Sequence, residues 1–247
     1  MFHIGRCGSG VLGDLLAQNP AIAWEGELLK PRRFHRDLPF PLRRLWPGAP
    51  LRDRAMLRLV RDKLAGADGT MAYGFETKFF HLEREGVSLA TFLRTVEQGG
   101  VDRYVILRRR NLLRIVASGL IAARAGHHHA SDVGPRPDPI VIDPGRVPLD
   151  RTEMPLVALL ERWDHQYADL ERRLDEATTL SVFYEDDVAA DPSVGYRKIC
   201  TYLGVDAVQA EVRLRPTNPY PLDALVANLD EVQRELEHTK FGWMVDA

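Results

Sequence analysis

The sequence predicts a three-layer α/β fold in which a central, mostly parallel sheet is flanked by helices. Short strand-like runs alternate with longer runs of helical period along the chain. The run at residues 104–107 is apolar throughout, which is typical of a strand buried on both faces of a parallel sheet. A glycine-rich segment at residues 5–10 separates the first strand from the first helix, as in P-loop-like folds. With 247 residues and no Pro/Gly/Ser-rich linker, we expect a single domain over residues 1–247.

The elements follow from the period of the apolar residues. Strands are predicted where short runs are apolar or alternate, and these are residues 2–4, 21–24, 71–80, 104–107 and 180–184. Helices are predicted where apolar residues recur at helical spacing, and these are residues 11–16, 51–64, 88–96, 112–124, 155–174, 192–203 and 221–237. Ser88 is expected to cap the third helix. Two stretches without a period, 30–50 and 126–152, are predicted to be irregular surface loops.

Composition excludes several classes of function. The 33 basic and 35 acidic residues give a net charge of -2, so we expect no nucleic-acid partner and only local anion sites. No apolar run approaches the ~20 residues of a transmembrane segment, and no secretory pattern opens the chain, so we expect a soluble, cytoplasmic protein. Cys7 and Cys200 form no disulfide framework, and neither they nor His127-His128-His129 have the partners of a metal site. No metal requirement is expected.

The segment Gly5-Arg6-Cys7-Gly8-Ser9-Gly10 lies at the strand-to-helix turn, where backbone N–H groups and the helix dipole hold phosphate in parallel sheets. A nucleotide-triphosphate P-loop requires a Lys after the last glycine, and Val11 stands there. Residues 8–13 spell the GxGxxG of NAD-binding Rossmann oxidoreductases, with Glu25 or Glu27 as the ribose-binding acid. Against this second interpretation, Arg6 and Cys7 interrupt the strand that should run into the first glycine.

The third interpretation is a phosphosulfate loop. Arg6 would supply the cation, and Gly8, Ser9 and Gly10 would supply amides and a hydroxyl to a 5′-phosphosulfate. A plain tight turn with a helix cap at Ser9 is the purely structural alternative. The segment alone does not choose among these interpretations.

A second motif follows the apolar strand at residues 104–107. Arg110 stands at the strand end, and Ser118 comes two helical turns later. Such a pair can hold one more phosphate on the same sheet edge as the glycine-rich loop. Dinucleotide enzymes have no need for this pair, so the second motif favours the phosphosulfate interpretation.

Together the two motifs resemble those of the PAPS-dependent sulfotransferases, which pair a 5′-phosphosulfate loop, (R/K)-(S/x)-G-(S/T)-(S/T)-(L/x), with an Arg-x7-Ser segment for the 3′-phosphate. Similarity to the bacterial and carbohydrate-acting branches extends over nearly the whole chain, at Gly26-Glu27, Tyr184-Glu185-Asp186, Asp191-Pro192 and residues 199–204, 218–222, 228–231 and 242–244. The resemblance implies PAPS (3′-phosphoadenosine-5′-phosphosulfate) as donor and 3′,5′-ADP as product. The residues that it implies for donor binding are Arg6, Cys7, Gly8, Ser9, Gly10, Val11, Arg110 and Ser118.

Two positions of the loop depart from the family pattern. Gly10 stands where a Ser or Thr is usual, so one hydroxyl contact to the 5′-phosphate is missing, and Cys7 replaces a common Ser. These departures leave open a catalytically silent nucleotide-binding relative as an alternative.

Sulfuryl transfer in line depends on positioning and on cations near the leaving oxygen, a role that we expect of Arg6. The acceptor hydroxyl needs a general base. Glu76 resembles the base of heparan-type sulfotransferases, although the neighbouring Thr77 and Lys78 are swapped, and Glu27 and Glu25 are the alternatives. Lys78 is expected to assist the sulfuryl group or to pair with an acid. His81 is expected on the same strand as Glu76, hydrogen-bonded and partly buried.

The resulting prediction is a sulfotransferase that moves a sulfuryl group from PAPS to a hydroxyl of a carbohydrate, lipid or small-molecule acceptor. The irregular segments 30–50 and 126–152 are the expected acceptor walls, because loops at the carboxyl ends of strands carry specificity in such folds. The sequence does not identify the acceptor.

Overall fold

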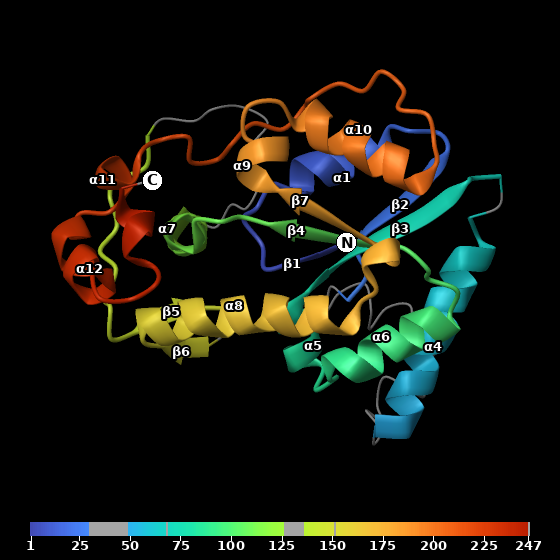
Figure 1. Ribbon diagram of the computed structural model, residues 1–247, viewed down its shortest axis with the longest axis horizontal. Helices are drawn as coiled ribbons and strands as arrows, with labels where there is room; N and C mark the ends of the chain where they lie inside the picture. The colour runs from blue at the N-terminus through green and yellow to red at the C-terminus, as the bar shows by residue number, and fades with distance from the viewer. Residues whose placement is uncertain (30–48, 68, 126–135, 151, 247) are drawn as a thin grey trace.

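The computed structural model describes residues 1–29, 49–67, 69–125, 136–150 and 152–246. Its centre is a five-stranded sheet in the order β2-β3-β1-β4-β7, and every pairing in it is parallel (Figure 1). The strands are β1 Phe2–His3, β2 Ile22–Glu27, β3 Ala72–Lys78, β4 Tyr104–Arg108 and β7 Thr179–Phe183. The predicted α/β fold with a central parallel sheet is confirmed. Because β1 is the middle strand, the glycine-rich segment leaves the sheet at its centre.

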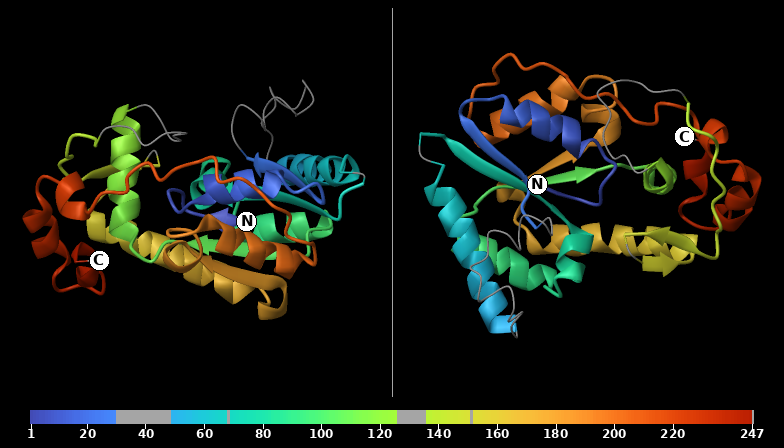
Figure 2. Two further views of the ribbon diagram at one scale, coloured as in Figure 1. Left: turned by 90° about the horizontal axis from the view of Figure 1, so that it is seen from above. Right: turned by 180° about the vertical axis from the view of Figure 1, so that it is seen from behind.

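Helices cover both faces of the sheet, as Figures 1 and 2 show from three sides. One face carries α1 Ser9–Ala17 and α10 Pro192–Leu203; the other carries α4 Ala49–Ala65, α5 Phe79–Arg84, α6 Leu89–Gln98 and α8 Leu156–Arg173. Successive residues of β4 point to opposite faces: Val105 and Leu107 join the core under α1 and α10, whereas Ile106 joins the core on the other side. The strand is therefore buried on both faces, as its uniform apolarity predicts.

A third group of elements gathers around α7 Leu112–Ala125 at one end of the molecule, away from β2 and α4 (Figure 2). It contains the antiparallel pair β5 Val147–Leu149 and β6 Thr152–Met154, the helices α11 Leu222–Leu225 and α12 Leu229–Leu236, and a 3₁₀ turn at Gly242–Val245. The remaining short elements are the 3₁₀ turn Glu176–Thr178 before β7 and α9 Tyr184–Asp187 directly after β7.

The predicted strand 71–80 is too long, because β3 ends at Lys78 and α5 begins at Phe79. Alternation alone would extend the strand, but the ring of Phe79 packs edge-on against Tyr167 with centroids 5.4 Å apart. This contact turns the chain into a helix. His81 therefore lies on α5 and not on a strand, and it is 2% exposed.

Two further predictions are corrected. Residues 126–152 are not irregular throughout, since β5 and the start of β6 fall within them. The predicted helix 221–237 is interrupted, because Val226 pairs with Ile140 in an isolated parallel bridge and the Ala227 N–H donates to the Ile140 carbonyl at 2.7 Å. Residues 30–48 of the other predicted loop lie outside the described residues, and Ala49 and Pro50 already belong to α4.

Candidate anion-binding and catalytic site

The glycine-rich segment bends sharply between β1 and α1. Gly5, Arg6 and Gly8 all have left-handed backbone, with φ of 119°, 54° and 85°. Gly8 has no room for a side chain, since a Cβ there would lie 2.7 Å from Val188 Cγ1. Left-handed Gly8 followed by helical Ser9 is the pattern in which successive N–H groups turn toward one point and form an anion-binding nest. The segment is therefore shaped to bind an anion at the N-terminus of α1.

Arg6 joins the glycine-rich loop to α7. Its Nε donates to Ser118 Oγ at 2.9 Å, and its Nη2 donates to Thr217 Oγ1 at 2.5 Å. Ser118 is 6% exposed and also accepts from Asn218 Nδ2 at 3.2 Å. The two motifs that the sequence singles out thus meet at Arg6 and Ser118. A left-handed non-glycine residue such as Arg6 costs about 1–3 kcal/mol of strain, and such strain gathers at functional sites.

A second guanidinium, that of Arg109, lies beside Arg6. Its Nη1 donates to the Arg6 carbonyl at 3.3 Å, and its Cζ stacks 4.4 Å from the centroid of the Tyr184 ring. Within the described part of the chain, the buried Nε of Arg109 has no hydrogen-bond partner. Burial, and then the charge of Arg109, lower the pKa of Arg6, and burial also lowers the pKa of Arg109. Two crowded, partly desolvated cations form a site that an anion would stabilise.

Arg110 points to a different partner. Its guanidinium forms a two-point ion pair with Asp186, at 2.6 and 2.5 Å, and stacks 4.4 Å from the centroid of the Phe183 ring. Its backbone N–H and that of Asn111 donate to Glu185. The structure therefore brings Arg110 to α9, and it shows no contact between the Arg110 guanidinium and Ser118.

The predicted general bases lie on β2 and β3, and each is paired with a basic side chain. Glu76 is 6% exposed and contacts His3 Nε2 through Oε2 at 2.9 Å. Burial opposes ionisation of Glu76, but the hydrogen bond and charge of His3, together with the charge of Lys78, hold its pKa below the usual value. Glu27 accepts from Lys78 Nζ at 2.6 Å, and Glu25 accepts from Lys63 Nζ at 3.2 Å.

Lys78 and His81 flank the glycine-rich loop and Glu27. A Cβ built on Gly5 would lie 3.9 Å from Lys78 Cε, so Lys78 reaches the loop, and His81 Nε2 is 3.7 Å from Glu27 Oε2. Burial, and then the charge of Lys78, lower the pKa of His81 to about 3. His81 is therefore neutral near pH 7. The predicted burial of His81 is confirmed, although it lies on a helix.

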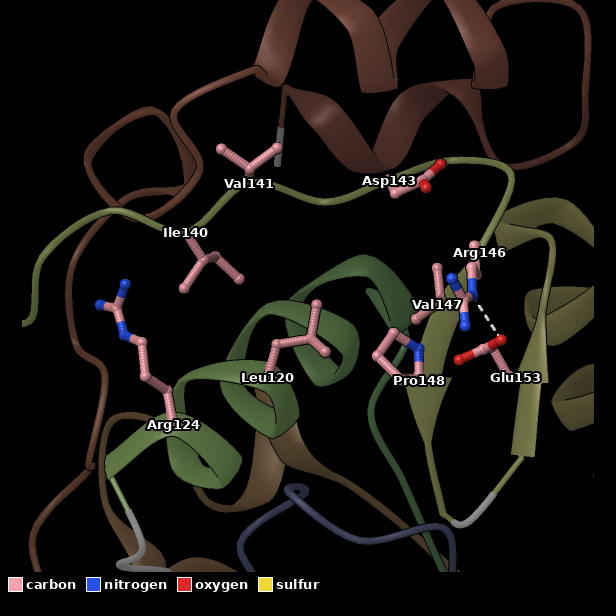
Figure 3. A pocket seen from close by; sticks show the side chains of 9 residues that line it. All are labelled: Leu120, Arg124, Ile140, Val141, Asp143, Arg146, Val147, Pro148 and Glu153. Atoms are coloured by element: carbon pink, nitrogen blue, oxygen red, sulfur yellow. Dashed lines mark hydrogen bonds and ion pairs between the residues drawn. The ribbon is translucent and has the colours of Figure 1, made fainter.

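Two cavities lie near the glycine-rich loop and α7. A cavity of about 480 Å³ lies among α7, residues 140–146 and the β5-β6 pair, and none of the predicted site residues lines it (Figure 3). A crevice of about 10 Å³ lies between α5 and α8, and both Ile4 and Asp150 line it. Between the glycine-rich loop and α7, the side chain of Arg6 itself fills the gap to Ser118.

Two other predictions concern metals and membranes. Among the described residues, no three His, Cys, Asp or Glu side chains gather as a metal site, and His127, His128 and His129 lie outside those residues. None of the helices in the described ranges combines the length and apolarity needed to cross a bilayer.

Comparisons with known proteins give one structural match. No family model matches the sequence, and no curated protein matches it. Among solved structures, the crystal structure of a sulfotransferase from Alicyclobacillus acidocaldarius is similar, with a TM-score of 0.48 and 17% identity over 99% of this chain and 94% of that chain. A similarity of this size does not assign a function. The function proposed below therefore depends on the contacts of the site.

Three residues that the structure places at the loop are not among the predicted catalytic or donor-binding residues: Arg109, Tyr184 and Thr217. The sequence offers Arg109 as added positive charge at the donor site or as a solvent-facing residue, and Tyr184 as part of a structural corner. The signal for Arg109 is present, since Arg109 and Arg110 are adjacent at the end of β4 and only one guanidinium can turn toward the loop. Thr217 carries no such signal, because 211 residues separate it from Arg6.

Proposed function

We propose that this chain is a sulfotransferase that moves a sulfuryl group from PAPS to a hydroxyl of a carbohydrate, lipid or small-molecule acceptor. The observation that supports it is the hydrogen bond between Arg6 and Ser118, which joins an anion-binding loop to the helix after β4. A donor with phosphate groups at both its 3′ and 5′ positions needs anion sites on both of these elements. A mononucleotide with a single phosphate group needs only one anion site.

In this proposal the backbone amides of Gly8, Ser9 and Gly10 bind the 5′-phosphosulfate. Cys7 and Val11, on either side of them, belong to the same donor-binding loop. Arg6 stabilises the charge that develops on the leaving oxygen. Ser118 and Arg110 hold the 3′-phosphate, and Arg109, which lies nearer the loop, supplies further positive charge. Lys78, which reaches Gly5, assists the sulfuryl group. Donor binding then requires Arg6 to exchange its contacts with Ser118 and Thr217 for the anion.

A second candidate is the NAD-binding oxidoreductase. Gly13, the last glycine of the GxGxxG match, lies close against the sheet, since a Cβ there would be 2.7 Å from Trp24 Nε1 and 2.9 Å from Glu76 Oε1. Close packing of helix on strand is the role of the third glycine in dinucleotide-binding folds. Against it, Glu27 is engaged by Lys78, and Arg6 has left-handed backbone inside the turn.

Calorimetric titration with 3′,5′-ADP, 5′-AMP and NADH separates these functions. A sulfotransferase site should bind 3′,5′-ADP at least about tenfold more tightly than 5′-AMP, a difference of about 1.4 kcal/mol. Tighter binding of NADH than of 3′,5′-ADP would reject the proposal. Turnover of labelled PAPS with a panel of hydroxyl compounds then distinguishes an enzyme from a silent nucleotide-binding relative.

A further inference from the structure

The strongest unassigned feature is Asp150, in the turn between β5 and β6. Asp150 is a non-glycine residue with left-handed backbone, φ 52°. It lines the crevice between α5 and α8 together with Ile4, the residue that leads into the glycine-rich loop. Asp is one of the residues that tolerate left-handed backbone, so this conformation suits the short turn between the paired residues Leu149 and Thr152.

Charged groups of both signs surround Asp150. Lys78 from β3 and Arg162 from α8 are the positive groups that act on it, and Glu83 from α5 is the negative one. Arg162 and Gln166 both donate to Glu83, so Glu83 is already engaged. Among the described residues, the carboxylate of Asp150 accepts no hydrogen bond and forms no ion pair. Its oxygens are therefore available to a proton donor.

Asp150 differs in this respect from the carboxylates that the sequence offers as general base. Glu76 is shared with His3, Glu27 with Lys78, and Glu25 with Lys63. A carboxylate held by a cation is a weaker proton acceptor, because the ion pair stabilises its charged form. Lys78 acts electrostatically on Asp150, and its side chain also reaches Gly5. Lys78 therefore links Asp150 to the glycine-rich loop, where the sulfuryl group would lie.

We propose, resting on the sulfotransferase function above, that Asp150 is the general base that accepts the proton of the acceptor hydroxyl. In this step the hydroxyl oxygen bonds to sulfur, its proton passes to an Asp150 carboxylate oxygen, and the bond from sulfur to the bridging oxygen breaks. The electron pair of that bond leaves with 3′,5′-ADP, so atoms and charges balance.

Burial supports this role. It raises the pKa of Asp150 to about 6, against the opposing charges of Lys78 and Arg162. A base is most effective when its pKa lies near the working pH. Glu76, whose pKa is lowered, is a poorer match.

The test is the pH dependence of transfer from ³⁵S-labelled PAPS to water, which is a hydroxyl acceptor present in every assay. For the wild type we expect sulfate release to fall below pH about 6. The Asp150→Asn variant should release sulfate at least about 100-fold more slowly, because general bases typically contribute this much. Its rate should also no longer fall below pH about 6, so this acid limb of the pH profile should be lost. Asn tolerates left-handed backbone as Asp does, so the variant should fold.

Two controls make the result decisive. Asp143→Asn changes an exposed carboxylate that lies in the same segment and lines the separate cavity of Figure 3, and it should keep both the rate and the acid limb. Affinity for 3′,5′-ADP, which Asp150→Asn should leave within about twofold, reports on the proposed function independently. An Asp150→Asn variant that keeps the acid limb overturns the assignment, and so does a wild type that binds 3′,5′-ADP but releases sulfate no faster than buffer. Failure to bind 3′,5′-ADP instead overturns the sulfotransferase function.

Discussion

The Arg6 guanidinium donates to the hydroxyl of Ser118 at 2.9 Å, although 112 residues separate them in the chain. Parallel strand order explains the contact, because β1 and β4 are neighbours and their carboxyl ends open at one edge. A loop after one strand and a helix after the next can therefore serve a single ligand.

Ser118→Ala tests whether this contact belongs to a nucleotide site. The substitution removes the acceptor of both Arg6 and Asn218 and should cost about 1–2 kcal/mol of unfolding free energy, as for other lost buried hydrogen bonds. It should also weaken the binding of 3′,5′-ADP about tenfold and change the binding of 5′-AMP little, since only 3′,5′-ADP carries a 3′-phosphate. Ser88→Ala is the control, because Ser88 caps α6 and its loss costs a similar free energy far from the loop. Equal weakening of both nucleotides would contradict a 3′-phosphate role.

A second prediction concerns the ion pair of Arg110 with Asp186. If Arg110 reads a 3′-phosphate, its guanidinium must leave Asp186, so the carboxylate competes with the ligand. Arg110→Ala should weaken the binding of 3′,5′-ADP about tenfold, with little effect on the binding of 5′-AMP. Asp186→Asn should strengthen the binding of 3′,5′-ADP several-fold. The gain from Asp186→Asn should vanish in the Arg110→Ala background.

Arg173→Ala provides the matched control for this pair. Arg173 is 42% exposed and bonds Asp169, as Arg110 is 44% exposed and bonds Asp186. Arg173→Ala should leave the affinities for 3′,5′-ADP and 5′-AMP unchanged. If Asp186→Asn has no effect, Arg110 is a structural residue, and Arg109 becomes the cation that reads the phosphate.

These residues also show where sequence reasoning succeeds. The apolar run at 104–107 becomes β4, and the glycine spacing places a tight turn before α1, because both patterns are local. Neighbouring residues decide such features through backbone preference and burial. Parallel topology constrains where strand ends lie, and Arg6 of the first motif contacts Ser118 of the second, whereas Arg110 of the second motif pairs with Asp186.

The parts that could not be predicted depend on distant packing. Arg110 turns to Asp186, and Arg109 to Tyr184, because α9 comes to lie against the end of β4 from 76 residues away in the chain. Phe79 leaves the strand pattern because Tyr167 packs on it. The unengaged carboxylate of Asp150 likewise follows from how β5 and β6 lie against α5 and α8. None of these contacts has a local signature.

A third prediction tests the shape of the glycine-rich loop. Gly8→Ala places a Cβ 2.7 Å from Val188 and 3.1 Å from Tyr184, on backbone with φ 85°. Gly204→Ala has a similar φ of 71° with nothing within 4 Å, so it isolates the cost of left-handed backbone, about 1–2 kcal/mol. Gly8→Ala should cost about 1–3 kcal/mol more than this, from overpacking. Urea denaturation measures both, and equal losses would show that Val188 and Tyr184 move aside.

The last prediction follows from the environment of Asp150 and needs no substrate. Its folded pKa of about 6 lies above the ~3.9 of an unfolded Asp, so the folded chain binds the proton more tightly. Stability contributed by the protonated form is present below pH about 4 and is lost as pH rises through about 6, because the charged carboxylate is poorly solvated there. Asp150→Asn removes this loss. The variant should therefore match the wild type near pH 4 and exceed it by about 1–3 kcal/mol at pH 7 and above, with the difference growing between these values. Urea unfolding at several pH values measures the difference, and a constant offset from pH 4 to 8 would mean that Asp150 is not desolvated as the structure indicates.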